Sequence, residues 1–532
     1  MIRNVTPRQL REWILDEDEL ALLDVREEGV FGADGHLLFA VCVPLSHLEI
    51  DILERVPRKS VRMVLCDGGD GLAGRAAAKL EEWGYGDISI LDGGAPGWEA
   101  AGYVVFRGVN VPSKAFGEFV EHQSGTPSVS AEELKAMMKG GKNIVVLDSR
   151  PWGEYRRMSI PTGINCPGVE LAYRVHDIVD DPETTIVVNC AGRTRSIIGA
   201  QSLINAGISN RVVALRNGTM GWALAGFDLD NGAERNFPDV TDGGLDRARA
   251  AAASVAGRFD VNTITSDTLA AWQDEAGARS LYVLDVRNPA EYEAGHRPGS
   301  VSAPGGQLVQ ATDRWVCTLG ARIVLIDDTG VRALMTASWL VQMGWRDVAV
   351  LEGGLGSGAL ETGPSQPPMP AIESQSMGTV SVTDLQAMIA HGAVTVVDLA
   401  TSLEYRAGHI PGAWWAIRAR LPESLGRIGG DGPLVFTSPD EVLARLAAGD
   451  ARALTNRSVR ILGGGNAAWR AAGGALSDGF ENMADDNNDV QYKAYDHTEN
   501  IEFHMQEYLS WETGLVEQIE RDGTARFRHV PA

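Results

Sequence analysis

The chain has few cysteines for its length, five in 532 residues. They stand far apart, as Cys42, Cys66, Cys166, Cys190 and Cys317. This number and spacing exclude a disulfide framework and a CxxC metal site. The cysteine chemistry that remains is that of a single reactive thiol.

Long apolar runs are missing as well. No window approaches the roughly 18 apolar residues of a membrane span. The opening MIRNVTPRQLREWILDEDEL has no apolar stretch of signal-peptide length behind basic residues. We therefore expect a soluble, cytoplasmic protein.

Positive charge is in deficit, with 47 Lys and Arg against 71 Asp and Glu and a formal net charge of −24. Such a field repels phosphate backbones and anionic lipid headgroups, so we expect neither nucleic acid nor a membrane as a partner. An anionic substrate would need arginines placed locally beside it.

One pattern occurs four times along the chain. Each occurrence begins with a hydroxyl residue suited to an N-cap, followed four positions later by a leucine that would face a core. These pairs are Thr6 and Leu10, Ser130 and Leu134, Thr265 and Leu269, and Ser381 and Leu385. An apolar run ending in Asp follows in each repeat and predicts a buried strand, with the Asp at Asp24, Asp148, Asp285 and Asp398.

A second apolar run in each repeat leads to a loop. The residue 42 positions after the strand-end Asp is Cys66, Cys190 and Asp327 in the first three repeats, and the fourth has FTSPDEV without a cysteine. Alternating strands and helices of this kind imply right-handed βαβ units around a mostly parallel sheet. We therefore predict an α/β protein of four tandem domains, each a mostly parallel sheet flanked by helices.

The predicted domain boundaries fall at segments rich in Gly, Pro, Ser or acidic residues, near 110–128, 231–257 and 361–377. This gives domains over 1–110, 111–245, 246–365 and 366–483, and a C-terminal helical tail over 484–532. In the tail, one apolar helix face is predicted from Phe503, Tyr508, Leu509, Leu515, Val516 and Ile519. We expect this face to pack on the domains or on a second subunit, which leaves a homodimer open.

Cys190 is the strongest candidate for chemistry. It stands between a predicted strand and a predicted helix in TIVVNCAGRTRSIIGAQSLINAG, where open α/β sheets bind ligands. Backbone N–H groups and the helix dipole would stabilise a thiolate there, and Arg193 and Arg195 would add positive charge. We expect a lowered thiol pKa and affinity for a small anionic sulfur donor.

The expected reaction has two stages and needs neither a metal nor another cofactor. The thiolate attacks the outer sulfur of thiosulfate, which leaves a Cys190 persulfide and sulfite. Cyanide or a thiol then accepts the sulfur and regenerates the thiolate.

Several motifs together resemble the rhodanese family, which takes in thiosulfate and mercaptopyruvate sulfurtransferases. They are the strand-end Asp-x-Arg with a following Glu-Tyr, the turns GHRPGS at Gly295 and GHIPGA at Gly408, and the loop CAGRTRS. The second repeat departs from the pattern with Met158-Ser159 in place of the Gly-His. The resemblance covers nearly the whole chain up to about residue 480.

The resemblance implies roles for individual residues. Cys190 would carry the persulfide, and the residues that follow it would bind the substrate: Ala191, Gly192, Arg193, Thr194 and Arg195. Asp148 and Arg150 are expected to form a structural ion pair near the strand end.

The other repeats lack this combination. Cys66 is the candidate for a second sulfur-accepting thiol, although Asp67 and Asp70 beside it would raise its pKa and repel thiosulfate. The third repeat has Asp327 at that position and the fourth has no cysteine, so neither can form a persulfide. We expect both to be structural or recognition domains.

Three alternatives can be compared with this interpretation. A phosphatase or arsenate reductase needs an Arg six positions after the Cys, where this chain has Ser196 and Leu72, so this function is not expected. A persulfide carrier or scaffold, loaded by a partner enzyme, would turn over free thiosulfate poorly. A mercaptopyruvate sulfurtransferase has small hydroxyl residues in the loop, so the two arginines here favour thiosulfate.

Overall fold

The computed structural model describes residues 2–370 and 377–531. Within these residues the strands form four sheets of five strands, and each sheet places its strands in the same order, first-fifth-fourth-second-third of its repeat. The pairings within the sheets are parallel. The predicted α/β fold of four repeats is confirmed, and part of the expected joint 361–377 lies outside the described residues.

In the first repeat, strands and helices alternate along the chain, and the helices flank the sheet. Its strands are β1 (Arg3–Val5), β2 (Ala21–Asp24), β3 (Val41–Cys42), β4 (Met63–Cys66) and β5 (Ile88–Leu91). Its helices are α1 (Pro7–Leu15), α2 (Glu28–Asp34), α3 (Leu48–Arg55), α4 (Leu72–Glu82) and α5 (Gly94–Ala100).

The second repeat has the same core and two additional helices at its ends. Its strands are β6 (Ser128–Val129), β7 (Ile144–Asp148), β8 (Ile164–Asn165), β9 (Thr185–Asn189) and β10 (Val212–Leu215). Its helices are α6 (Val111–Ser124), α7 (Ala131–Lys139), α8 (Trp152–Arg157), α9 (Glu170–Ile178), α10 (Thr194–Asn205), α11 (Gly218–Leu224) and α12 (Asp242–Arg258).

The third and fourth repeats complete the series. The third contains β11 (Asn262–Ile264), α13 (Ser266–Asp274), β12 (Leu281–Asp285), α14 (Pro289–Ala294), β13 (Val301–Ser302), α15 (Gly305–Gln310), β14 (Arg322–Ile326), α16 (Val331–Gln342) and β15 (Val348–Leu351). The fourth contains β16 (Gly378–Val380), α17 (Val382–Ala390), β17 (Thr395–Asp398), α18 (Ser402–Ala407), β18 (Trp414–Trp415), α19 (Leu421–Ser424), β19 (Leu434–Thr437), α20 (Val442–Arg452), β20 (Val459–Leu462) and α21 (Gly465–Ala471).

The predicted helix starts are confirmed in all four repeats. The side chains of Thr6, Ser130, Thr265 and Ser381 each accept the backbone N–H three positions on. These bonds satisfy N–H groups that the first turn of a helix leaves without partners.

Two of the expected linkers are packed helices instead. Around 110–128 the chain forms α6, and a Cβ added to its Gly117 would lie 2.9 Å from Thr194 Cγ2, so α6 and α10 touch closely. Around 231–257 it forms α12, which buries Ala248, Ala252 and Val255. Composition misled the prediction because Pro112 stands in the first turn of α6, where proline is tolerated, and because α12 is rich in alanine.

The tail forms α22 (Ile501–Thr513) and α23 (Leu515–Asp522), separated at Gly514. Leu509, Leu515 and Ile519 are buried, whereas the Phe503 side chain is 56% exposed. The prediction of a single apolar face is wrong, because Phe503 faces solvent and Leu509 packs in a different cluster from Leu515 and Ile519. The tail does pack on the repeats, as expected.

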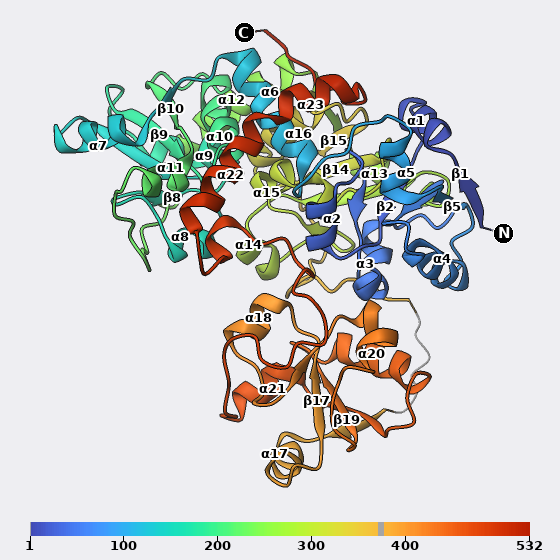
Figure 1. Cartoon of the computed structure of the whole chain (residues 1–532). Coiled ribbons are helices and arrows are strands. Elements are labelled where there is room, and N and C mark those ends of the chain that lie inside the picture. Colours follow the sequence, from blue (N-terminus) through green and yellow to red (C-terminus); the bar gives the residue numbers. More distant parts are fainter. Residues whose placement is uncertain (1, 371–376, 532) are drawn as a thin grey trace.

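The first three repeats lie together, and the fourth (orange) lies beside them at the lower end of the view (Figure 1). The fourth repeat joins the first through the buried pair Arg418–Glu49, with 2.6 Å between Nη1 and Oε2. Helix α22 (red) runs along the second repeat (Figure 1), where it packs against α6 and α11. No helix within 2–370 and 377–531 is long and apolar enough to span a membrane.

Candidate active site

The four loop heads can be compared through strand pairing. In the second repeat Asp148 pairs with Asn189, so Cys190 is the first residue beyond the strand register. In the first repeat Asp24 pairs with Cys66 itself. The residues next in line after each paired residue are therefore Asp67, Cys190, Asp327 and Ser438.

Backbone contacts support this alignment independently. The carbonyl oxygens of Asp67, Cys190 and Ser438 accept the backbone N–H groups of Ala95, Thr219 and Asn466, at 2.9, 2.8 and 2.8 Å. In all four repeats a glycine shortly after the last strand lies against the loop-head carbonyl. These glycines are Gly94, Gly218, Gly354 and Gly465.

The placement of Cys66 at a loop head is therefore wrong. The first repeat has one residue more than the second between the strand-end Asp and the loop head, so equal spacing aligned Cys66 with the wrong position. Cys66 ends β4 in the core with 0% exposure, and burial raises its pKa well above the usual range.

In the first and fourth loops, a side-chain oxygen of the loop-head residue accepts backbone N–H groups of the loop. The Asp67 carboxylate accepts the N–H groups of Gly69, Gly71 and Ala73, at 2.8, 3.1 and 2.9 Å. Ser438 Oγ accepts the N–H of Ala444 at 3.0 Å. Backbone amides that converge in this way attract anions, and here the chain supplies the oxygen atoms itself.

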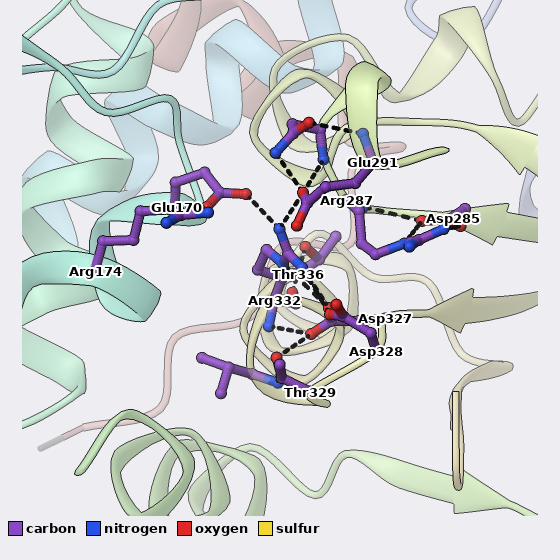
Figure 2. A network of polar contacts seen from close by, with 12 residues as sticks. Glu170, Arg174, Asp285, Arg287, Glu291, Asp327, Asp328, Thr329, Arg332 and Thr336 are labelled. Carbon is purple, nitrogen blue, oxygen red and sulfur yellow. Dashed lines mark hydrogen bonds and ion pairs between the residues drawn. The ribbon is translucent and has the colours of Figure 1, made fainter. Parts of the chain in front are cut away.

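The third loop is tied into an ion-pair network that crosses to the second repeat (Figure 2). Arg332 is fully buried, and its guanidinium lies 3.0 Å from Asp327 Oδ1, 2.7 Å from Asp328, 2.7 Å from Glu291 and 2.8 Å from Glu170. The third loop head therefore has a structural role.

Cys190 lies at the head of the remaining loop, between β9 and α10, and is 2% exposed. Its thiol lies 3.5 Å from Ser196 Oγ, which in turn donates to the Arg193 carbonyl at 2.8 Å. Burial raises the pKa of the Cys190 thiol, and the charge of Arg195 and hydrogen bonds from Ser196 offset this only in part, while Glu512 raises it further. The predicted lowering of this pKa is wrong, because desolvation of the thiolate outweighs the positive charge nearby.

Arg193 points into α6. Its Nε and Nη2 donate to Glu118 at 2.6 and 2.8 Å, and Nη2 also contacts Glu121. Two carboxylates thus compensate one guanidinium, so Arg193 adds no net positive charge to the loop.

Arg195 lies on the other side and reaches toward the third repeat. Its guanidinium is 2.9 Å from Glu154 and 3.3 Å from Gln307. Its charge lowers the pKa of Cys190. Of the two loop arginines, Arg195 is the one that acts on the thiol.

Helix α22 covers the middle of the loop. Thr194 Oγ1 donates to Glu512 Oε1 at 3.0 Å. A Cβ added to Gly192 would lie 3.0 Å from both Glu512 Oε2 and Tyr508 Cε1. Sequence reasoning missed Glu512, and it assigned Tyr508 only to an apolar face; their spacing of four on a predicted helix was the available signal.

A cavity of about 1030 Å³ lies between the four repeats and the tail. Ala191 and Arg195 of the loop line it, together with Lys114, Glu154 and Tyr508. The loop that holds Cys190 therefore borders a space large enough for a small anion and an acceptor.

Asp148 and Arg150 form the predicted structural pair. Arg150 Nε and Nη2 donate to the two Asp148 oxygens at 2.9 and 2.7 Å, and both residues are buried. Asp285 and Arg287 repeat this geometry in the third repeat (Figure 2). This pair fixes the end of the strand and is separate from the thiol.

Comparison with known proteins identifies the class. A family model described as "Rhodanese-like domain" matches residues 6–101, 130–225, 265–358 and 381–472, most of the chain. The chain belongs to the rhodanese family.

Among solved structures, the chain resembles a thiosulfate sulfurtransferase from Pseudomonas aeruginosa, with 47% identity, a TM-score of 0.95, and coverage of 99% of this chain and 100% of the other. A curated relative, the HTH-type transcriptional regulator Rv0324 of Mycobacterium tuberculosis (strain ATCC 25618 / H37Rv), is 32% identical over 111 residues, 20% of this chain. The chain spans about half of that relative, 48% of its length. Four rhodanese-like domains and the likeness to a thiosulfate sulfurtransferase support a sulfurtransferase.

Proposed function

We propose that this protein moves sulfane sulfur from thiosulfate to a thiophilic acceptor, cyanide or a thiol, through a persulfide on Cys190. The observation that carries the proposal is the loop-head position, which holds a thiol in the second repeat and Asp67, Asp327 and Ser438 in the others. Of the residues at this position, Cys190 alone can form a persulfide.

The chemistry is balanced without an external oxidant or reductant. The Cys190 thiolate attacks the outer sulfur of thiosulfate, the sulfur–sulfur bond of the donor breaks, and sulfite leaves with its electron pair. Cyanide then attacks the outer sulfur of the persulfide, thiocyanate leaves, and the thiolate is restored.

The burial of Cys190 favours a small donor over a partner protein. The residue is 2% exposed, and α22 lies over the middle of its loop. A carrier loaded by a protein persulfide would need its thiol within reach of another polypeptide.

The proposal is tested by mapping the added sulfur. Reduced protein is incubated with thiosulfate, freed of donor and alkylated, and its peptides are analysed by mass spectrometry. We expect one extra sulfur on Cys190, removed by cyanide, and none on Cys66, which serves as an internal control. Absence of sulfur on Cys190 would exclude thiosulfate as the donor.

A further inference from the structure

Lys114 lies on α6, between the family matches that end at residue 101 and begin at residue 130. It is only 6% exposed, yet it lines the same cavity as Ala191 and Arg195 of the active-site loop. A lysine ammonium is rarely buried unless it is paired with an opposite charge. Packing alone therefore does not account for the burial of this ammonium group.

The partners of Lys114 are neutral. Its Nζ donates to Tyr508 Oη at 2.7 Å and lies 4.6 and 4.9 Å from the ring centroids of Tyr508 and Trp511. Glu512 is reached only through Tyr508, whose hydroxyl lies 3.0 Å from Glu512 Oε1. Within the described part of the chain, no carboxylate oxygen lies within the 4.0 Å of an ion pair with Lys114.

Unlike Lys114, both loop arginines form ion pairs with carboxylates. Arg193 is paired with Glu118 and Glu121, and Arg195 with Glu154. Their charges are already compensated by the protein, whereas the ammonium of Lys114 has donors to spare after its bond to Tyr508.

A buried cation without a counter-ion is costly, and burial accordingly lowers the pKa of Lys114 although Glu512 opposes this. An anion that enters the cavity would supply the missing charge. Thiosulfate is such an anion, because its sulfonate end carries three oxygens opposite the sulfur that reacts.

We propose that Lys114 binds the sulfonate end of the anionic sulfur donor while Cys190 attacks its outer sulfur. This inference rests on the proposed function. Lys114 forms no covalent bond; it holds the sulfonate through the attack and the departing sulfite after the sulfur–sulfur bond breaks. The substrate site thus includes a residue from α6, outside the matched rhodanese-like segments, held by Tyr508 of the tail.

The test compares Lys114→Met, which keeps length without charge, with Lys114→Arg, which keeps the charge. Because the reaction has two stages, kcat/KM for thiosulfate reports sulfur loading and kcat/KM for cyanide reports unloading. We expect Lys114→Met to lower the thiosulfate value on the order of tenfold to a hundredfold, as loss of a charged hydrogen bond does. The cyanide value should change little, and Lys114→Arg should recover part of the loss.

Lys135→Met is the matched control, since Lys135 stacks on Trp222 and Phe227 of the same repeat away from the cavity. It removes the same charge and should leave the thiosulfate value unchanged. A thiosulfate value for Lys114→Met equal to that of the control would overturn the inference. Thermal unfolding of each variant separates misfolding from loss of binding.

A binding measurement separates this inference from the proposed function. Thiosulfate is titrated calorimetrically into Cys190→Ala, with and without Lys114→Met. Weaker binding in the double variant supports Lys114 as the anion site even if the wild-type protein fails to turn over thiosulfate, in which case the proposed function alone falls. Equal binding in the two variants rejects Lys114 whatever the turnover shows.

Discussion

At the scale of single residues, the environment of Cys190 decides at which pH its thiolate forms. Burial and the Glu512 carboxylate raise its pKa, and Arg195 and Ser196 lower it less. In the proposed reaction the thiolate is the nucleophile, so sulfur loading should increase as pH rises through and above the ordinary thiol pKa of about 8.5. We expect Glu512→Gln to move the midpoint to lower pH, since it removes a negative charge near the sulfur.

The midpoint is measured from the rate of Cys190 alkylation by iodoacetamide as a function of pH, followed by peptide analysis. Glu234→Gln is the control, because Glu234 forms an exposed pair with Arg156. A midpoint for Glu512→Gln that matches this control, or lies above it, would show that the tail carboxylate does not act on the thiol.

At the scale of elements, the sequence predicts best what local patterns determine. The four N-caps and the Asp148–Arg150 pair follow from short motifs, and the structure confirms them. Equal spacing misplaced Cys66, because strand register rather than residue count defines a loop head. The contact of α22 with Gly192 was beyond prediction, since it joins segments some three hundred residues apart through packing alone.

This contact yields a prediction about the tail. Gly192→Val places methyl groups where Glu512 and Tyr508 already lie, 3.0 Å from an added Cβ. Overpacking of this kind costs about 1–3 kcal/mol, so we expect α22 to loosen and sulfur loading to fall roughly tenfold or more. Gly153→Val is the control, because nothing lies within 4 Å of a Cβ built on Gly153. Limited proteolysis of the tail measures the loosening; equal cleavage of both variants would contradict it.

At the scale of the whole molecule, buried ion pairs join the third repeat to the repeat that carries Cys190. Arg332 of the third repeat neutralises Asp327 in its own loop and bonds Glu170 at the start of α9, in the repeat that carries Cys190 (Figure 2). The carboxylate at the third loop head therefore takes part in a domain interface. In the first and fourth loops, side-chain oxygens of Asp67 and Ser438 accept the backbone N–H groups of their own loops.

The interface is tested by Arg332→Met. Removing the buried guanidinium takes an ion-pair partner from Asp327, Asp328, Glu170 and Glu291, of which Glu170 keeps its pair with Arg174. Breaking a buried pair costs about 3–5 kcal/mol. Burial raises the pKa of Asp327 to about 6 even beside Arg332, and loss of the guanidinium removes the charge that opposes this rise. A carboxylate with a folded-state pKa above its unfolded value stabilises the fold at low pH, and this stability is lost as pH rises. We therefore expect a larger deficit in urea unfolding at about pH 8 than at about pH 5. Arg156→Met removes an exposed pair with Glu234 and a contact with the Trp152 ring, and it should change stability by less than about 1 kcal/mol at both pH values. A deficit for Arg332→Met that does not depend on pH would mean that packing, not charge, holds the two repeats together.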